Sequence, residues 1–349
     1  MDKILPTYND PLFSILIIVL LILIVAIVSF FMGNYKEEKQ RKNLKKFLGK
    51  INTDDCTLDI DKLPFEEALI TPLSLLADTF STQGEYQKSI GIYLYLVDNI
   101  SPFAKKEHLL EGLGITYLKA GFLKRSESLF LEILKKHARN RDALYYIEVV
   151  YELLDEYKKA EQTLVPLNIL GENSNVLKAH LELSSLLRDK NINVDKRVNK
   201  LKLFVKDSIY SYRRVIKELF KLAPKEAWAL LDINKIDSIL DIMWFLPSSN
   251  LNFDIISKSE ILSSIYIAKG VLKSKNKVLE SNIFVIDTIN SAQRGGSFEV
   301  DLNFKYGCNR CKQHFPIAFE RCPQCYAVDS IQVKVSLIKK EPYSGYSLL

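Results

Sequence analysis

Residues 73–96 read LSLLADTFSTQGEYQKSIGIYLYL, and the pattern of this stretch returns twice farther along the chain. Apolar residues at helical spacing lead to an aromatic residue, a turn residue follows, and a second apolar series opens with a small residue. The matching positions of the three copies are Leu73, Leu76, Ala77, Phe80, Gly84, Tyr86, Ser89, Tyr93 and Leu96; Leu110, Leu113, Gly114, Tyr117, Gly121, Leu123, Ser126, Phe130 and Ile133; and Leu144, Ile147, Glu148, Tyr151, Asp155, Tyr157, Ala160, Leu164 and Leu167. A period of about 34 residues is typical of helical repeat proteins.

Each copy predicts two amphipathic helices that are joined at Gly84, Gly121 or Asp155. A turn between closely packed helices needs a residue that tolerates positive φ, and the closest approach of the helices needs a small side chain. An ordinary helical bundle also spaces apolar residues three and four apart, but it does not keep turn, aromatic and small residues in fixed register. The pattern resembles the tetratricopeptide repeat over residues 65–170, in an α-solenoid with a concave surface that binds other proteins.

Beyond residue 170 the register of the repeats decays. Residues 175–188, 197–222 and 225–246 look helical, and Trp228 and Trp244 occupy apolar positions. We expect residues 171–292 to form either degenerate repeats or a helical cap.

The N-terminal residues 12–32 are uncharged and almost entirely apolar. A helix of this length rises about 30 Å, enough to cross a bilayer. One lysine precedes the run, whereas basic residues are frequent after it: Lys36, Lys39, Arg41, Lys42, Lys45, Lys46 and Lys50. We therefore expect a transmembrane anchor in residues 1–34, a basic juxtamembrane linker in residues 35–64, and a cytoplasmic location for the rest of the chain.

Four of the five cysteines form the pattern C-x2-C-x10-C-x2-C, made by Cys308, Cys311, Cys322 and Cys325. Two such turns place four sulfurs around one ion, so these cysteines are the candidate ligands of one metal ion. Zinc and iron both suit four thiolates. Because His314 lies inside a site that four sulfurs already complete, we interpret it as a surface or packing residue, like His108, His137 and His180. Cys56 has no assigned role.

Alternating apolar residues flank this motif and predict two strands, with a short apolar segment between the cysteine pairs. The apolar positions are Phe298, Val300, Leu302, Phe304 and Tyr306 before it, and Ile331, Val333, Val335 and Leu337 after it. We expect residues 298–340 to form a small β ribbon of rubredoxin-like or zinc-ribbon type, whose folding depends on its metal. Loss of the metal is expected to unfold this tail and to leave the helices intact.

Composition excludes several classes of function. Charged residues make up 26% of the chain and the net charge is +6. The basic residues do not form a separate domain with interleaved aromatics, so nucleic acid is not an expected partner. No nucleophile elbow, H-E-x-x-H, P-loop or recognisable carboxylate pair is present, so we do not expect an enzyme.

The order of span, repeats and ribbon resembles the lipopolysaccharide assembly protein B family. The likeness is sharpest at Met32-Gly33, at the spacer between the cysteine pairs, at Cys322-Pro323-x-Cys325, and at Ala179-His180 with Glu182-Leu183-Ser184. The repeat region is short, and Lys312 stands where many such ribbons have glycine after the second cysteine.

The resemblance implies a single-pass protein of the bacterial inner membrane, with its N-terminus in the periplasm. It implies a scaffold or adaptor that coordinates lipopolysaccharide synthesis and presents a lipid A deacetylase to a membrane-bound AAA+ protease. It also implies that the ribbon packs against the repeats. The alternative is a membrane-tethered, rubredoxin-like electron carrier, because iron with four thiolates transfers single electrons. Oligomeric state is left open.

Overall fold

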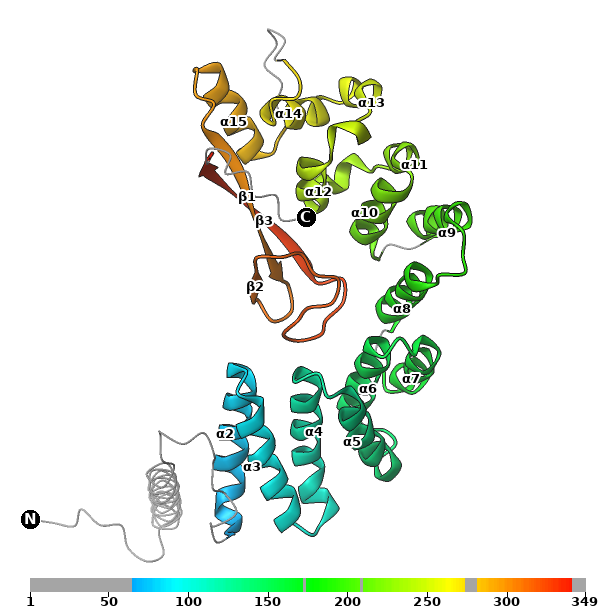
Figure 1. Ribbon diagram of the computed structural model, residues 1–349, viewed down its shortest axis with the longest axis vertical. Coiled ribbons are helices and arrows are strands. Elements are labelled where there is room, and N and C mark those ends of the chain that lie inside the picture. Colours follow the sequence, from blue (N-terminus) through cyan, green and yellow to red (C-terminus); the bar gives the residue numbers. More distant parts are fainter. Residues whose placement is uncertain (1–64, 172–173, 208–209, 274–280, 341–349) are drawn as a thin grey trace, which may run out of the picture. The chain divides into compact units, whose positions relative to one another are not determined.

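The computed structural model describes residues 65–171, 174–207, 210–273 and 281–340 (Figure 1). The expected anchor in residues 1–34, the linker in residues 35–64 and Cys56 lie outside these residues. None of the helices in the described ranges combines the length and apolar character that a bilayer crossing requires. The described part of the chain is mostly helical and carries one small sheet near the C-terminus.

The chain divides into two compact units, one ending at Leu154 and the other beginning at Asp155. The segment expected to hold the repeats is thus shared between the two units. The helices of the first unit are η2 (Glu67–Leu69), α2 (Ile70–Gln83), α3 (Tyr86–Asn99), α4 (Phe103–Lys119), α5 (Leu123–Lys136) and α6 (Arg141–Leu153).

The three turn residues named from the sequence all have positive φ. Gly84 has φ of 85°, Gly121 of 80° and Asp155 of 60°. The first two lie between α2 and α3 and between α4 and α5, and Asp155 follows α6. The prediction of a turn residue that tolerates positive φ at these three positions is confirmed.

The small residues after these turns are buried as predicted. Ser89, Ser126 and Ala160 are fully buried. The hydroxyl of Ser126 donates to the backbone oxygen of Gly114 at 2.8 Å, which joins α5 to α4 where their backbones lie close together. Phe130 of α5 also fits against Gly114, so the glycine matters for more than backbone freedom.

Two glycines inside helices therefore predict opposite effects of the same substitution. At Gly114, an added Cβ would lie 2.8 Å from the buried ring of Phe130, so Gly114→Ala should destabilise the first unit by about 1–3 kcal/mol. At Gly91 of α3 an added Cβ meets nothing within 4 Å, so Gly91→Ala should stabilise by about 0.5–1 kcal/mol. Urea unfolding of the two variants measures the difference. Equal effects at both positions would contradict the packing described for α4 and α5.

The second unit contains helices of 11–14 residues and several shorter segments. These are α7 (Tyr157–Ile169), α8 (Asn175–Arg188), α9 (Val194–Asp207), α10 (Tyr212–Leu222), α11 (Pro224–Ala229), η3 (Ile233–Ile239), α12 (Leu240–Phe245), η4 (Ser248–Asn250), α13 (Phe253–Lys258), α14 (Glu260–Ala268) and α15 (Phe284–Arg294).

Two stretches of this unit that were expected to be helical do contain helices, but each is divided into shorter segments. Residues 197–222 contain α9 and α10 in place of one helix, and Ser211 before α10 has φ of 64°. Residues 225–246 are divided among α11, η3 and α12, because Asp232 accepts a hydrogen bond from the Asn234 N–H and starts a new helical segment. Trp228 and Trp244 are buried in the core, as their apolar positions indicated.

The sheet has three antiparallel strands in the order β2-β1-β3. Strand β1 spans Val300–Cys308, β2 spans His314–Phe315 and β3 spans Ile331–Lys339. The register places three apolar pairs on one face: Leu302 with Leu337, Phe304 with Val335, and Tyr306 with Val333. Polar pairs such as Asn303 with Ser336 occupy the other face, so one face is available for packing.

The apolar face of the sheet shares a core with the helices of the second unit. Leu302, Phe304 and Tyr306 belong to the same buried cluster as residues of α8, α10, α12 and α14. The ring of Phe304 meets that of Phe245, at the end of α12, with centroids 5.4 Å apart. Helix α15 contacts β1 and β3, and η3 contacts β3. The sheet is therefore not an independent tail, because its apolar face is covered by helices.

Candidate metal centre

The first pair of cysteines lies in a tight turn at the end of β1. Cys308 is the last residue of the strand, and its carbonyl accepts the N–H of Lys312 at 2.9 Å. The N–H of Cys308 donates to the carbonyl of Gln313, also at 2.9 Å. These bonds fold residues 308–313 into a loop that brings Cys308 and Cys311 to the same side.

The second pair repeats this arrangement. The N–H of Tyr326 donates to the carbonyl of Cys322 at 2.9 Å, and the N–H of Cys322 donates to the carbonyl of Ala327 at 2.9 Å. Lys312 and Tyr326 hold the same position after their cysteine pairs, with φ of 62° and 57°. The two loops are therefore built alike, and each presents two sulfurs.

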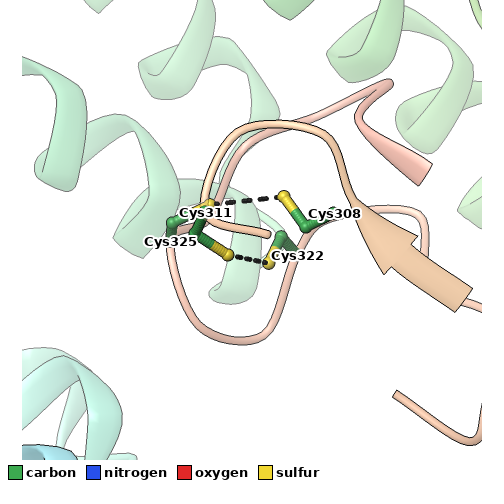
Figure 2. Close-up of side chains that lie close together, drawn as sticks. All are labelled: Cys308, Cys311, Cys322 and Cys325. Atoms are coloured by element: carbon green, nitrogen blue, oxygen red, sulfur yellow. Dashed lines mark hydrogen bonds between the residues drawn. The ribbon is translucent and has the colours of Figure 1, made fainter. Parts of the chain in front are cut away.

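Figure 2 shows the four cysteines converging on one point. The Sγ atoms of Cys308 and Cys325 lie 3.7 Å apart, as do those of Cys311 and Cys322, and all four lie within 4.8 Å of one another. A tetrahedral ion with metal–sulfur bonds of about 2.3 Å separates its sulfurs by about 3.8 Å. The four cysteines could therefore bind one metal ion with little movement. Their four sulfur donors and the distances between them suit tetrahedral coordination.

Burial and hydrogen bonding make the four thiols unequal. Cys308 and Cys322 are buried, whereas Cys311 and Cys325 are partly exposed. Burial raises the pKa of the Cys308 thiol, but the Ser330 hydroxyl and the N–H groups of Cys311 and Arg310 outweigh burial and lower that pKa to about 6. Burial raises the pKa of Cys322 to about 12. A metal must displace the protons of such thiols, so its binding should weaken as the pH falls.

The structure also places the four histidines. His314 Nε2 lies 2.7 Å from Lys334 Nζ, and His137 Nδ1 lies 2.6 Å from a carboxylate oxygen of Glu107. His108 Nδ1 lies 3.8 Å from Glu111, and His180 is buried in α8. Among the described residues, the only group of histidines, cysteines and carboxylates placed to hold an ion is the set of four cysteines.

A buried ion pair beside the ribbon was not foreseen from the sequence. Arg213 of α10 donates two hydrogen bonds to the carboxylate of Asp241 in α12, at 2.6 and 2.5 Å. The Tyr306 hydroxyl donates to the same carboxylate at 2.9 Å. Burial and the neighbouring Asp241 raise the pKa of Tyr306 to about 12, so the hydroxyl keeps its proton at neutral pH. These hydrogen bonds join β1 to α10 and α12.

A second polar contact joins the helices to the segment between the cysteine pairs. Glu320 accepts a hydrogen bond from Lys217 at 3.1 Å and lies 3.6 Å from Arg214. Arg214 also donates to the Ser184 hydroxyl at 2.9 Å and lies 3.3 Å from His180 Nδ1. The short stretch that includes His180 and Ser184 thus lies against the arginine that contacts the ribbon.

Lys312 offers a test of the loop geometry. Its side chain is exposed and its backbone is in the left-handed region, where glycine is favoured. Lys312→Gly should therefore stabilise the metal-loaded second unit by about 0.5–1 kcal/mol. The neighbouring variant Gln313→Gly, where φ is not positive, should destabilise by a similar amount. Guanidinium unfolding at saturating metal measures both, and stabilisation by both or by neither would contradict the assigned backbone.

Fold and site together define a helical, repeat-like protein with a tetracysteine cluster in a small C-terminal sheet. A comparison with models of known protein families finds none that matches this chain, and a comparison with curated proteins finds no match either.

Proposed function

We propose that this chain is a non-enzymatic scaffold or adaptor that binds partner proteins through tetratricopeptide-like helical repeats. The observation that carries this proposal is the recurrence of one helix–turn–helix construction. Turns of positive φ stand at Gly84, Gly121 and Asp155, and a buried small residue follows each of them. Stacked helix pairs of this kind offer extended surfaces that hold proteins or peptides.

The cysteine cluster acts in this proposal as a structural lock. Cys308, Cys311, Cys322 and Cys325 would hold one zinc or iron ion in a rubredoxin-like ribbon. The ribbon's apolar face shares its core with the helices of the second unit, which supports a role in maintaining that unit. The ion would then set the shape of the helical surface.

The membrane anchor and the cellular role belong to the same proposal. The apolar run at residues 12–32 and the basic residues after it support an inner-membrane anchor with the bulk of the chain in the cytoplasm. The resemblance to the lipopolysaccharide assembly protein B family leads to the partners: a lipid A biosynthesis enzyme and a membrane AAA+ protease. His180 and Ser184, two of the residues on which that resemblance rests, contact Arg214. Arg214 in turn lies close to Glu320 of the ribbon, which supports a role for these residues in holding the ribbon.

Co-purification tests the proposal. The full chain, solubilised from membranes in mild detergent, should recover the lipid A deacetylase and the protease. Gly114→Ala, which disturbs the repeat packing, should lower this recovery, whereas Ser336→Ala on the exposed strand face should not. Recovery of neither partner by the unaltered chain would overturn the adaptor proposal. Protease protection in spheroplasts tests the topology, because residues after 33 should resist an external protease.

Electron transfer is the second candidate, favoured by one observation. Cys311 and Cys325 are partly exposed, so an iron ion held by this cluster would lie near solvent. Four-thiolate iron sites carry single electrons. Metal analysis separates the two proposals, because stoichiometric zinc in the purified chain would remove electron transfer.

A further inference from the structure

Ser330 lies at a point where the two cysteine loops meet. It follows the second loop and directly precedes β3, and only 3% of it is exposed. Its backbone oxygen accepts the N–H of Asn309, in the first loop, at 2.7 Å. Its hydroxyl donates to the carbonyl of Ala327, the last residue of the second loop (residues 322–327), at 3.1 Å. One buried serine therefore contacts both loops.

The Ser330 hydroxyl also lies 3.4 Å from the sulfur of Cys308. In the thiol form, Cys308 donates its proton to the serine oxygen. A metal-bound cysteine is a thiolate and has no proton to donate, so this contact persists as a hydrogen bond only if its direction reverses. The serine proton then turns from the Ala327 carbonyl to the sulfur. A hydrogen bond to an ionised acceptor is stronger than one to a neutral carbonyl, which favours the reversal.

Resting on the metal site proposed above, we propose that Ser330 is a positioning residue for that site: its hydroxyl donates a hydrogen bond to the metal-bound thiolate of Cys308. Groups that hydrogen-bond metal ligands orient them and change metal affinity by about 10–100-fold. The same bond withdraws electron density from one sulfur. The bond would therefore lower the electron density that this sulfur donates to the bound ion, and it would also change the affinity for the ion.

The helices hold Ser330 in place through the preceding residue. The carboxylate of Asp329 accepts the backbone N–H of Ser211, which directly precedes α10. Burial raises the pKa of Asp329, and this hydrogen bond opposes the rise. Asp329 itself has φ of 49°, a backbone conformation that residues other than glycine adopt infrequently. The hydroxyl that faces Cys308 is thus positioned by contacts outside the cysteine loops.

Three variants of the full chain separate the hydroxyl from the rest of the serine. Ser330→Ala removes the hydroxyl and keeps the backbone bond to Asn309. Ser330→Thr keeps a hydroxyl. Ser336→Ala removes a hydroxyl from the exposed face of β3 and is the matched control. Zinc affinity is measured by chelator competition, and Co²⁺ is used as a probe because sulfur-to-cobalt charge-transfer bands report on thiolate ligands.

The proposal predicts that Ser330→Ala binds zinc about 10–100-fold more weakly. It also predicts a shift of the sulfur-to-cobalt band to lower energy, because a thiolate without its hydrogen bond is a better electron donor. Ser330→Thr and Ser336→Ala should match the unaltered chain in both measurements.

Two results would overturn the proposal. Unchanged zinc affinity and band position in Ser330→Ala would show that no such bond forms. Weaker affinity with an unchanged band would show that Ser330 acts on the fold of the loop alone. If the unaltered chain fails to bind one zinc or cobalt ion, the metal site itself is wrong, a failure distinct from either result with Ser330→Ala.

Discussion

Replacing Cys322 with serine is expected to release the metal, to unfold the ribbon and to destabilise the helices of the second unit. Cys322 is fully buried at the cluster, and the loss of one thiolate leaves a site that no longer completes a tetrahedron. Structural four-ligand zinc sites supply about 10 kcal/mol or more of folding free energy. Whole domains are stable by only about 5–15 kcal/mol. The free energy of metal binding therefore exceeds what a short sheet contributes to folding by itself.

The effect should reach the helices because the sheet covers them. When the ribbon unfolds, Leu302, Phe304 and Tyr306 leave the cluster they share with α10, α12 and α14. The expectation that loss of the metal leaves the helices intact treated the ribbon as a separate tail, and the shared core leads us to expect the opposite. Helices α2–α4 should not respond, because they hold a core of their own.

Hydrogen exchange with mass spectrometry, together with metal analysis, measures this prediction. Cys322→Ser should lose the metal and exchange faster in β1, β3 and α10–α15, with unchanged exchange in α2–α4. Cys56→Ser, which changes the cysteine outside the motif, should keep the metal. Full metal content in Cys322→Ser would contradict the ligand assignment, and unchanged exchange in α10–α15 would contradict the shared core.

Asp241→Ala is expected to cost about 3–5 kcal/mol, because it leaves the Arg213 guanidinium buried without its partner. The two side chains are only 6% and 13% exposed, so water compensates little for the lost carboxylate. The Tyr306 hydroxyl loses its acceptor in the same variant. Tyr306→Phe, which removes one hydrogen bond and keeps the ion pair, should cost about 1 kcal/mol.

An exposed ion pair of the same unit provides the control. Arg188 and Asp155 are paired, but their side chains are 63% and 51% exposed. Solvent screens such pairs, so Arg188→Ala should cost at most about 1 kcal/mol. Denaturant unfolding of the metal-loaded chain compares the variants. A cost for Asp241→Ala no larger than that for Arg188→Ala would show that Arg213 and Asp241 do not form a buried pair in solution.

The parts of the fold that were predictable from sequence depend on local chemistry. Gly84, Gly121 and Asp155 were recognised because positive φ restricts the residues that can occupy a turn. The four cysteines were recognised because their spacing leaves few other chemical uses. Both signals are contained in a few neighbouring residues.

What was missed depends on contacts between distant parts of the chain. Asp241 and Tyr306 are 65 residues apart, and neither carries a local pattern that marks it as a partner of the other. Ser330 looks like an ordinary residue before a strand until the fold places it against Cys308. The helical breaks near Ser211 and Asp232 were missed for a different reason, because an apolar pattern persists across both breaks and hides the local cap at Asp232. A signal at Tyr306 existed, because a tyrosine on the buried face of a strand needs a partner for its hydroxyl.

The most direct test of the account is the metal content of the purified full chain together with the protection of its cysteines. We expect one zinc or iron ion per chain, and thiol alkylation mapped by peptide mass spectrometry should spare Cys308, Cys311, Cys322 and Cys325 until a chelator is added. A folded chain that contains no metal and whose four cysteines react at once would contradict the account.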